Sequence, residues 1–280
     1  MKCLFNYIKN ICSNFWFMEI MFSFSDCSDV YENGYGASGV YPIWLQRGYR
    51  FSLFYCDMET ISELSNKTGW TVIQKRMNGE VDFEKNWDKY VTGFGNITGE
   101  HWVGLENIYS ITSQLLYRQF DQKTEKPGPR LRIDFEDWDG FRAFTEFDNF
   151  IINGPTFKYK INFVGNVFGT TQAHNSPSPI GYNAFSAVGK DSTKQKCPKL
   201  MRGGWWFDDR CGPANLNGPY AKSKTIMDEN NIYWSNWTHV NQRNAALRRV
   251  SMKIQYWQGY EKVAYYFNTY SSWHKLFYEN

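Results

Sequence analysis

Residues 202–220 read R-G-G-W-W-F-D-D-R-C-G-P-A-N-L-N-G-P-Y, from Arg202 to Tyr220. Glycine and proline interrupt this stretch too often for a helix or a regular central strand, so it predicts a loop rich in aromatic rings. Trp205 and Trp206 allow two interpretations. They either floor a small-ligand or sugar site with polar groups at its rim, or they only pack a loop-rich subdomain into its core.

A second diagnostic stretch lies upstream, at residues 79–104. The two stretches match the patterns G-G-W-W-F-x-x-x-C-G-P-A-N-L-N-G-x-Y and G-x-V-D-F-x-x-x-W-x-x-Y-x-x-G-F-G-N-x-x-G-E-x-W-x-G. Together they resemble the fibrinogen C-terminal (fibrinogen-related) domains, the globe of fibrinogen chains, ficolins, tachylectins, tenascins and angiopoietins. The Cys211-Gly212-Pro213 turn most resembles the angiopoietin branch.

The resemblance extends from Asp26 to Gln255 and implies an α+β fold. The expected globe has a small stapled N-terminal sheet, a central antiparallel sheet with short helices, and a loop-rich C-terminal binding subdomain.

Hydrophobic periodicity predicts the same α+β class. Phe83, Trp87 and Tyr90 predict a helix of about two turns with Asp82 as its N-cap, ended at Gly93. A second helix is expected from the spacing of Leu105, Ile108 and Thr112. Strands are expected at residues 51–56, 131–138, 141–147, 159–163 and 249–254. In the last of these, Arg249, Ser251 and Lys253 are expected to face solvent.

Composition limits the function classes. Of 280 residues, 42% are hydrophobic and 21% charged, which is ordinary for a globular protein, whereas an aromatic fraction of 19% indicates a core of large rings. The net charge is only +3 and no dense Lys/Arg tract occurs, so nucleic-acid binding is not expected.

Six cysteines include no C-x-x-C pair, and no histidine lies near one with zinc-ligand spacing. The resemblance implies two disulfides, Cys27 with Cys56 and Cys197 with Cys211, each worth roughly 3 to 4 kcal/mol in the chain-entropy model. Disulfides imply an oxidising compartment, so we expect a secreted, extracellular protein. The sequons at Asn66, Asn96 and Asn236 point the same way.

Residues 1–25 are apolar and aromatic, but Lys9 and Glu19 interrupt them, so they form neither a clean signal peptide nor a clear membrane span. We interpret them as a damaged leader, with an atypical signal or short anchor as the alternative. Cys3 and Cys12 are then removed with it or available for interchain bridges. The expected domain covers residues 26–255, followed by an unassigned tail, 256–280. The sequence contains no heptad repeat or Gly-X-Y tract that would form a coiled-coil or collagen stalk.

Catalytic motifs are absent from the sequence: it has no G-x-S-x-G, H-E-x-x-H, phosphate loop or Rossmann fingerprint. His174 has no Ser or Cys partner in a motif and is interpreted as a structural histidine. Asp134 and Glu136 alternate on the polar face of an expected strand, which favours solvent-facing charges over a glycosidase pair. The sequence therefore predicts a protein that is not an enzyme.

Relatives that bind calcium do so just before the second disulfide, in a sequence like F-S-T-x-D-x-D-N-D. Here residues 185–193 read F-S-A-V-G-K-D-S-T, and only Asp191 keeps a carboxylate, so a Ca²⁺ site is expected to be weak or lost. Basic residues follow instead: Lys190, Lys194, Lys196, Lys199 and Arg202. They form either a solvated loop or a site for anionic ligands, such as sulfated or sialylated glycans or an acidic protein face.

In relatives that bind acetyl groups, a pocket beside the second disulfide is lined by aromatic rings and usually by a His after the cysteine. Gly212 holds that position here, and the loop before Cys211 is one residue longer than usual. The resemblance also implies a cis peptide at Arg210-Cys211. The candidate pocket positions are Trp206, Phe207, Cys211, Gly212, Tyr220, Tyr233 and Trp237.

Two functions follow from these observations. The first is a lectin-like recognition module that binds glycans or acetylated or anionic groups in defence or cell-surface recognition. The alternative is an angiopoietin-like receptor ligand or matrix protein with a cell-surface protein as partner, which the Cys-Gly-Pro turn and the missing pocket histidine favour.

Overall fold

A computed structural model describes residues 24–62, 68–121, 128–163, 167–169, 182–224, 231–235, 237 and 246–256. Most of the expected leader, the cysteines Cys3 and Cys12, His174 and nearly all of the C-terminal tail lie outside these residues.

The N-terminal part pairs one short helix with a hairpin. Helix α3 (Cys27–Glu32) begins after Asp26, whose side chain accepts a hydrogen bond from the Asp29 amide. Strands β1 (Gly39–Leu45) and β2 (Arg50–Asp57) form the antiparallel hairpin. A disulfide between Cys27 and Cys56 fastens the helix to β2.

A nine-stranded antiparallel sheet forms the centre of the described molecule, in the order β1-β2-β3-β13-β6-β7-β10, with β5 paired to β3 and β4 paired to β5. The N-terminal hairpin continues into this sheet through β2 and β3, rather than forming a separate small sheet. The further strands of the sheet are β3 (Trp70–Arg76), β4 (Phe94–Gly95), β5 (His101–Trp102), β6 (Arg130–Asp137), β7 (Arg142–Phe147), β10 (Val167–Gly169) and β13 (Leu247–Gln255).

Smaller elements surround the sheet. They are η1 (Pro155–Phe157), α6 (Cys197–Leu200) and two short ribbons: β8 (Ile151–Ile152) with β9 (Ile161–Asn162), and β11 (Ala214–Asn215) with β12 (Tyr233–Trp234). Helices beside a mainly antiparallel sheet confirm the expected α+β class.

The long helix α5 (Leu105–Asp121) confirms the expectation from the spacing of Leu105, Ile108 and Thr112, which are all buried. Within the part of the chain that the structure describes, every helix falls short of the length and apolar character that crossing a bilayer requires.

The expected helix after Asp82 begins later than the periodicity predicted. Helix α4 (Trp87–Thr92) is capped by Asn86, whose side chain accepts from the Lys89 amide, and it ends at Gly93 as expected. Asp82 instead accepts from the Glu84 amide in a local turn. The Trp87 amide donates to the Val188 carbonyl 2.8 Å away, so a tertiary contact fixes where the helix begins.

Strand β13 is also more buried than its alternation predicted. Val250, Met252 and Ile254 lie in the core as expected, but Lys253 is not solvent-facing. Its ammonium lies 2.8 Å from Asp57 Oδ2 and 2.6 Å from Asp134 Oδ2. Two carboxylates compensate the cost of burying this cation, which periodicity alone could not reveal.

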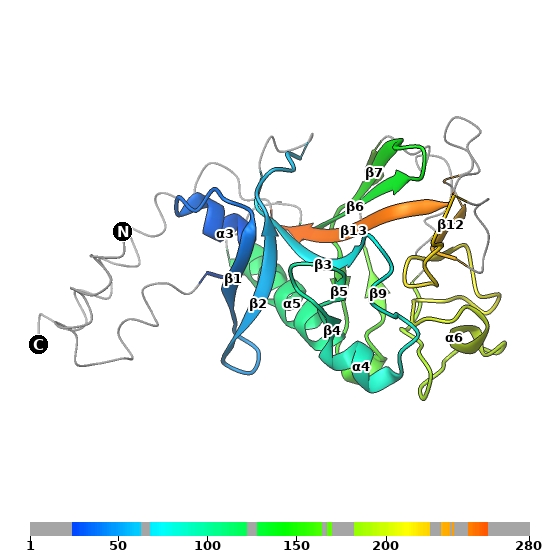
Figure 1. The fold of residues 1–280 in the computed structure, drawn as a ribbon. Helices are drawn as coiled ribbons and strands as arrows, with labels where there is room; N and C mark the ends of the chain where they lie inside the picture. Colours follow the sequence, from blue (N-terminus) through cyan, green and yellow to red (C-terminus); the bar gives the residue numbers. More distant parts are fainter. Residues whose placement is uncertain are drawn as a thin grey trace, which may run out of the picture.

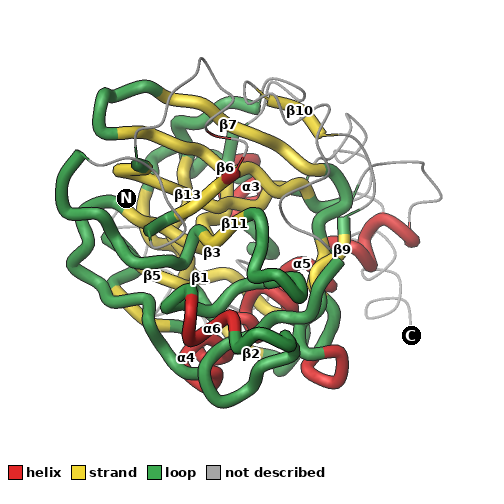
Figure 2. Tube along the Cα trace, turned by 90° about the vertical axis from the view of Figure 1, so that its right-hand side faces the viewer, coloured by secondary structure: helices red, strands yellow, loops and turns green. Residues whose placement is uncertain are grey.

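Figure 1 shows β13 crossing the middle of the molecule, with α3 at one end and β12 and α6 at the other. Viewed from that second end, the C-terminal subdomain consists mainly of loops in front of the sheet (Figure 2). The candidate site lies in this subdomain.

Candidate functional site

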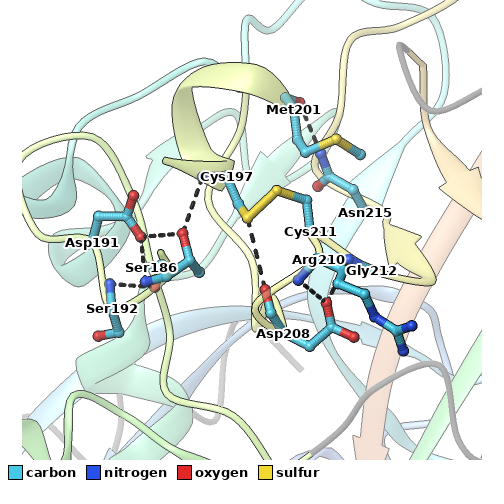
Figure 3. The surroundings of a disulfide bond; sticks show 11 residues. Ser186, Asp191, Ser192, Cys197, Met201, Asp208, Arg210, Cys211, Gly212 and Asn215 are labelled. Carbon is cyan, nitrogen blue, oxygen red and sulfur yellow. Dashed lines mark hydrogen bonds between the residues drawn. A yellow bond between two sulfur atoms is a disulfide. The ribbon is translucent and has the colours of Figure 1, made fainter. Parts of the chain in front are cut away.

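The C-terminal loops are fastened by a disulfide between Cys197, the first residue of α6, and Cys211 (Figure 3). The Cys197 amide donates to Thr193 Oγ1, which holds the start of the short helix. The structure thus contains both disulfides that the resemblance implied, and the quoted stretch from Arg202 to Tyr220 is a stapled loop.

A tight turn precedes Cys211, and the Asp208 carboxylate organises it. Asp208 Oδ1 accepts from the Arg210 amide at 2.8 Å and from the Gly212 amide at 2.9 Å (Figure 3). Cys211 has φ +65°, a left-handed conformation. The expectation of a cis peptide before Cys211 is wrong, since the described residues contain no cis peptide bond. The left-handed residue reverses the chain instead.

The twin tryptophans are core residues. Trp205 is fully buried and Trp206 is 1% exposed, with its ring packed against Phe185 and its Nε1 donating to the Tyr159 carbonyl at 2.9 Å. The Trp205 backbone pairs with Ser186. Of the two interpretations that the sequence left open, this burial supports packing into the core.

The glycines before the tryptophans allow a close backbone approach. A Cβ at Gly203 would lie 2.5 Å from the Asn217 carbonyl oxygen, which is closer than real Cβ atoms come to other atoms. The segments at Gly203 and Asn217 can therefore pack side by side only without a side chain there.

The asparagines of the A-N-L-N motif are structural. Asn215 donates to the Met201 carbonyl and Asn217 donates to the Gly204 carbonyl, both at 2.9 Å. Both side chains are fully buried. They tie two halves of the loop together, so the motif encodes a backbone scaffold.

Two side chains from β3 anchor this loop to the central sheet. Gln74 donates to the Leu216 carbonyl at 3.0 Å, and Arg76 donates to the Gly218 carbonyl at 2.8 Å. Burial lowers the pKa of Arg76 to about 10, while nearby Glu100 acts in the opposite direction. Sequence reasoning missed these residues, because a polar residue in a strand normally indicates a solvated face.

The candidate pocket positions do not form one exposed surface. Trp206, Phe207, Cys211 and Trp237 are buried, and the Trp237 ring packs against Phe135 and Phe141. Gly212, Tyr220 and Tyr233 are partly exposed.

Tyr220 supports the sheet as well as the loop. Its hydroxyl lies 2.8 Å from the Arg248 carbonyl and 3.0 Å from the Met77 carbonyl. Tyr233 pairs with Asn215 in the β11–β12 ribbon. These two tyrosines therefore act in the scaffold.

The solvent-facing part of the subdomain is basic. From Val188 to Pro213 there are six Lys or Arg and three Asp residues, giving a net charge of +3. Two of the cations are paired on the surface, Lys194 with Asp209 and Arg202 with Glu84. Exposed ion pairs of this kind contribute little to stability, about 0 to 1 kcal/mol each.

The residues around Asp191 do not fit a calcium site. Asp191 is exposed, and its Oδ1 accepts from the amide and hydroxyl of Thr193, both at 2.8 Å. Nowhere in the described ranges do three His, Cys, Asp or Glu residues gather in a way that could hold a metal ion. A Ca²⁺ ion requires several oxygen ligands, and this loop provides one carboxylate.

One sequon lies within the described structure. Asn96 is exposed beside β4, and its Oδ1 accepts from the Thr98 hydroxyl at 2.9 Å and from the Thr98 amide at 3.1 Å. Asn66 and Asn236 lie outside the described residues.

The carboxylates weighed as a glycosidase pair belong to ion pairs on β6. Glu136 is 8% exposed and accepts from Arg142 Nε at 2.8 Å and Arg249 Nη1 at 3.0 Å. Asp134 accepts from Arg132 Nε at 2.8 Å. These two carboxylates are less exposed to solvent than expected. Arginine side chains and the Lys253 ammonium neutralise their negative charge.

The family model for "Fibrinogen beta and gamma chains, C-terminal globular domain" matches residues 23–257. Among curated proteins, angiopoietin-2 of Canis lupus familiaris is 36% identical over 217 residues, covering 76% of this chain and 40% of the relative. Human angiopoietin-1 is 35% identical over 235 residues, covering 83% and 43%. The chain thus spans about two fifths of the length of these relatives.

Solved structures agree in fold. The fibrinogen-like globe domain of human ANGPTL2 superimposes with a TM-score of 0.69 at 30% identity, covering 83% of this chain and 98% of the globe. Lamprey fibrin D-dimer, solved with the peptide ligand Gly-His-Arg-Pro-amide, gives 0.65 at 25% identity, covering 85% of this chain and 76% of the fibrin chain.

Proposed function

Because the chain belongs to the family of fibrinogen C-terminal globular domains, we propose that it is a secreted recognition module that binds a cell-surface protein. Members of this family are binding modules, and the chain is not an enzyme. The proposed binding surface is the disulfide rim, which we define as the exposed residues Lys196, Lys199, Leu200, Arg210 and Pro213.

The observation that carries this proposal is the rigid, exposed character of the disulfide rim. The Cys197–Cys211 bridge and the Asp208 hydrogen bonds fix its backbone. Leu200 is 59% exposed beside Lys199, so the rim offers an apolar contact next to positive charge. A preorganised surface loses little conformational entropy on binding.

Charge indicates the kind of partner. The net charge of +3 between Val188 and Pro213 favours an acidic protein face. The peptide ligand of lamprey fibrin D-dimer adds support, since a chain with the same fold binds a polypeptide. Similarity to angiopoietins also supports the receptor-ligand function that the Cys-Gly-Pro turn suggested.

The lectin-like function, the first of the two that the sequence suggested, loses its main support. It required aromatic rings beside the second disulfide to stack on a sugar, and Trp206 and Trp237 are buried. Gly212 also stands where relatives that bind acetyl groups usually have a histidine.

Flow cytometry with the labelled full chain tests the proposal. We expect the double variant Lys199→Glu and Arg210→Glu to weaken binding to receptor-bearing cells by roughly tenfold or more. The matched control, Lys89→Glu and Lys222→Glu, reverses two exposed cations that are not part of the rim and should bind normally.

Trypsin treatment of the cells should abolish binding, and the chain should flow through N-acetylglucosamine resin. Equal binding by the rim variant and the wild type would overturn the proposal. Trypsin-resistant binding or elution from the resin by free sugar would instead support the lectin-like function.

A further inference from the structure

A cavity of about 570 Å³ opens on the central sheet, away from the Cys197–Cys211 disulfide. It lies on the face opposite the core, over strands β3, β13, β6 and β7. Its volume is within the range of roughly 300 to 1,000 Å³ that is typical of small-ligand sites. Its lining includes Lys75, Arg132, Asp134, Arg142, Phe144 and Arg249.

Strand register gathers these residues. Ser251 on β13 is opposite Lys75 on β3 and Asp134 on β6, and Asp134 is opposite Phe144 on β7. Alternate residues of a strand point to the same face, so these four side chains form one row across the sheet.

The next row belongs to the same face. Arg249 is opposite Glu136, which is opposite Arg142. Four strands therefore bring cations from distant parts of the sequence onto one surface.

One end of this surface is closed by the segment after β2. Asp57 and Thr60 both bind the Lys253 ammonium, and Ser62 donates to Glu146. At that end, the Lys253 ammonium is paired with the carboxylates of Asp57 and Asp134. The rest of the cavity is lined by Lys75 and by the Arg249–Arg142 row, and we call it the open part.

The open part carries more positive charge than its carboxylates neutralise. Glu136 accepts one hydrogen bond from Arg142 and one from Arg249. Each guanidinium has five N–H donors, so both retain donors for a ligand. Lys75 lies 4.9 Å from the Tyr55 ring, and no carboxylate among the described residues is within ion-pair distance of it.

The wall of the cavity is partly aromatic. Phe144 is 8% exposed, and the Arg132 guanidinium lies 3.8 Å from its ring centroid. An apolar wall beside positive charge suits a ring that carries an anionic substituent.

An added peptide strand does not suit this surface. The cavity lies on the face of the sheet, and β13 is already paired with β3 and β6, so its backbone groups are occupied. A ligand here must be held by side chains.

We propose that this cavity binds an anionic sugar residue of a glycan, a pyranose ring bearing a sulfate or carboxylate. Arg142 and Arg249 bind the acidic group, Lys75 adds positive charge at the β3 side of the cavity, and the wall at Phe144 contacts the ring. The site is separate from the disulfide rim, so the chain can bind a surface protein and a charged glycan together.

Isothermal titration with a fully sulfated heparin disaccharide and the full chain tests this proposal. We expect Lys75→Gln with Arg142→Gln to raise the Kd by roughly tenfold or more. Arg142 is 76% exposed and Arg249 still donates to Glu136 in this variant, so the fold should be retained. Ser251→Glu, which adds a carboxylate to the cavity and removes no cation, should weaken binding similarly.

Lys89→Gln with Lys222→Gln is the matched control, because these exposed cations lie outside the cavity. It should change the Kd by less than roughly twofold. Added NaCl should weaken binding to the wild type. The desulfated disaccharide should bind far more weakly.

Three outcomes would overturn the proposal. They are no binding of the sulfated disaccharide, an unchanged Kd in the cavity variants, or a loss of binding instead in Lys196→Gln with Lys199→Gln. A hexaglutamate peptide that binds as tightly as the disaccharide and is lost in the cavity variants would identify an acidic peptide as the ligand instead. The cavity variants change no residue of the disulfide rim. The glycan proposal can therefore hold even if the rim variant binds cells as well as the wild type does.

Discussion

The ammonium of Lys253 lies 2.8 Å from Oδ2 of Asp57, although 196 residues separate them in the sequence. This contact joins the last strand of the sheet to the segment that follows the N-terminal hairpin. Thr60 Oγ1 accepts from the same ammonium at 2.7 Å. The beginning and end of the domain thus stabilise each other, and this pair can be tested directly.

Asp57→Asn should lower the free energy of unfolding by about 2 kcal/mol at pH 7. Burial by itself raises the pKa of Asp57, but the Lys253 ammonium and hydrogen bonds from Lys253 and Thr60 lower it to about 2. This lies below the roughly 3.9 of an unfolded aspartate. The contribution is therefore complete above about pH 4 and is lost as the pH falls toward 2.

Urea denaturation of wild type and Asp57→Asn between pH 7 and pH 3 measures this effect. The difference between the two proteins should shrink as the pH falls. Glu59→Gln, an exposed neighbour, should cost little at any pH. A difference that is independent of pH would contradict the assignment.

Glu100→Gln should destabilise the protein by about 3 kcal/mol. The buried Glu100 carboxylate accepts backbone hydrogen bonds from Met77, Asn78, Gly79 and Val81. Burial raises its pKa, but these four amides outweigh burial and lower it. Glutamine has an NH2 group in place of one carboxylate oxygen. This NH2 donor would face a backbone N–H donor, and the hydrogen bond there would be lost.

Thermal denaturation and hydrogen exchange of the amides at residues 77–81 check this prediction. Exchange there should become faster than in the rest of the sheet. Glu80→Gln is the exposed control. Unchanged protection of the four amides in Glu100→Gln would contradict the role of the carboxylate.

Gly203→Ala should lower the free energy of unfolding by about 1 to 3 kcal/mol, because the new Cβ would lie 2.5 Å from the Asn217 carbonyl oxygen. Gly36→Ala is the matched control, since its nearest atom would be 3.9 Å away in the Tyr31 ring. Calorimetric melting of both variants measures the difference. Equal melting temperatures would show that the loop tolerates a side chain at Gly203.

Removing the second disulfide with Cys197→Ser and Cys211→Ser should lower the free energy of unfolding by roughly 3 kcal/mol, as expected for a loop of this length. The bridge spans 14 residues. Limited proteolysis should then cut first between Lys190 and Pro213, where the chain loses its closest constraint. Unchanged stability and an unchanged cleavage pattern in this double variant would contradict a stabilising role for the bridge.

Asn96 should carry an N-linked glycan when the chain is secreted by eukaryotic cells. Its side chain is exposed and hydrogen-bonded to the Thr98 hydroxyl of the same sequon. Mass spectrometry of the peptide at residues 90–101, with and without glycosidase, measures occupancy. Asn96→Gln should remove the added mass, and an unmodified Asn96 in secreted protein would contradict the prediction.

Several features of the fold could be predicted from the sequence because local chemistry determines them. The spacing of Leu105 and Ile108 predicted α5, alternation predicted the central strands, and Gly93 ended α4 as expected. The aromatic motifs indicated the family correctly, since their glycines and asparagines encode a specific backbone. Local patterns do not show which surfaces will meet, so the start of α4 and the burial of Lys253 were predicted wrongly.

The family, the α+β class and the disulfide-stapled loop could be predicted from the sequence, because they depend on residue types at fixed spacings. Three-dimensional packing was needed to show that Trp206 lies inside, and that Lys75, Arg142 and Arg249 line one cavity on the sheet. Whether a side chain is buried depends on the segment packed against it, and that segment often lies far away in the sequence. Trp206 is therefore a core residue, and cations that are scattered along the chain line one cavity.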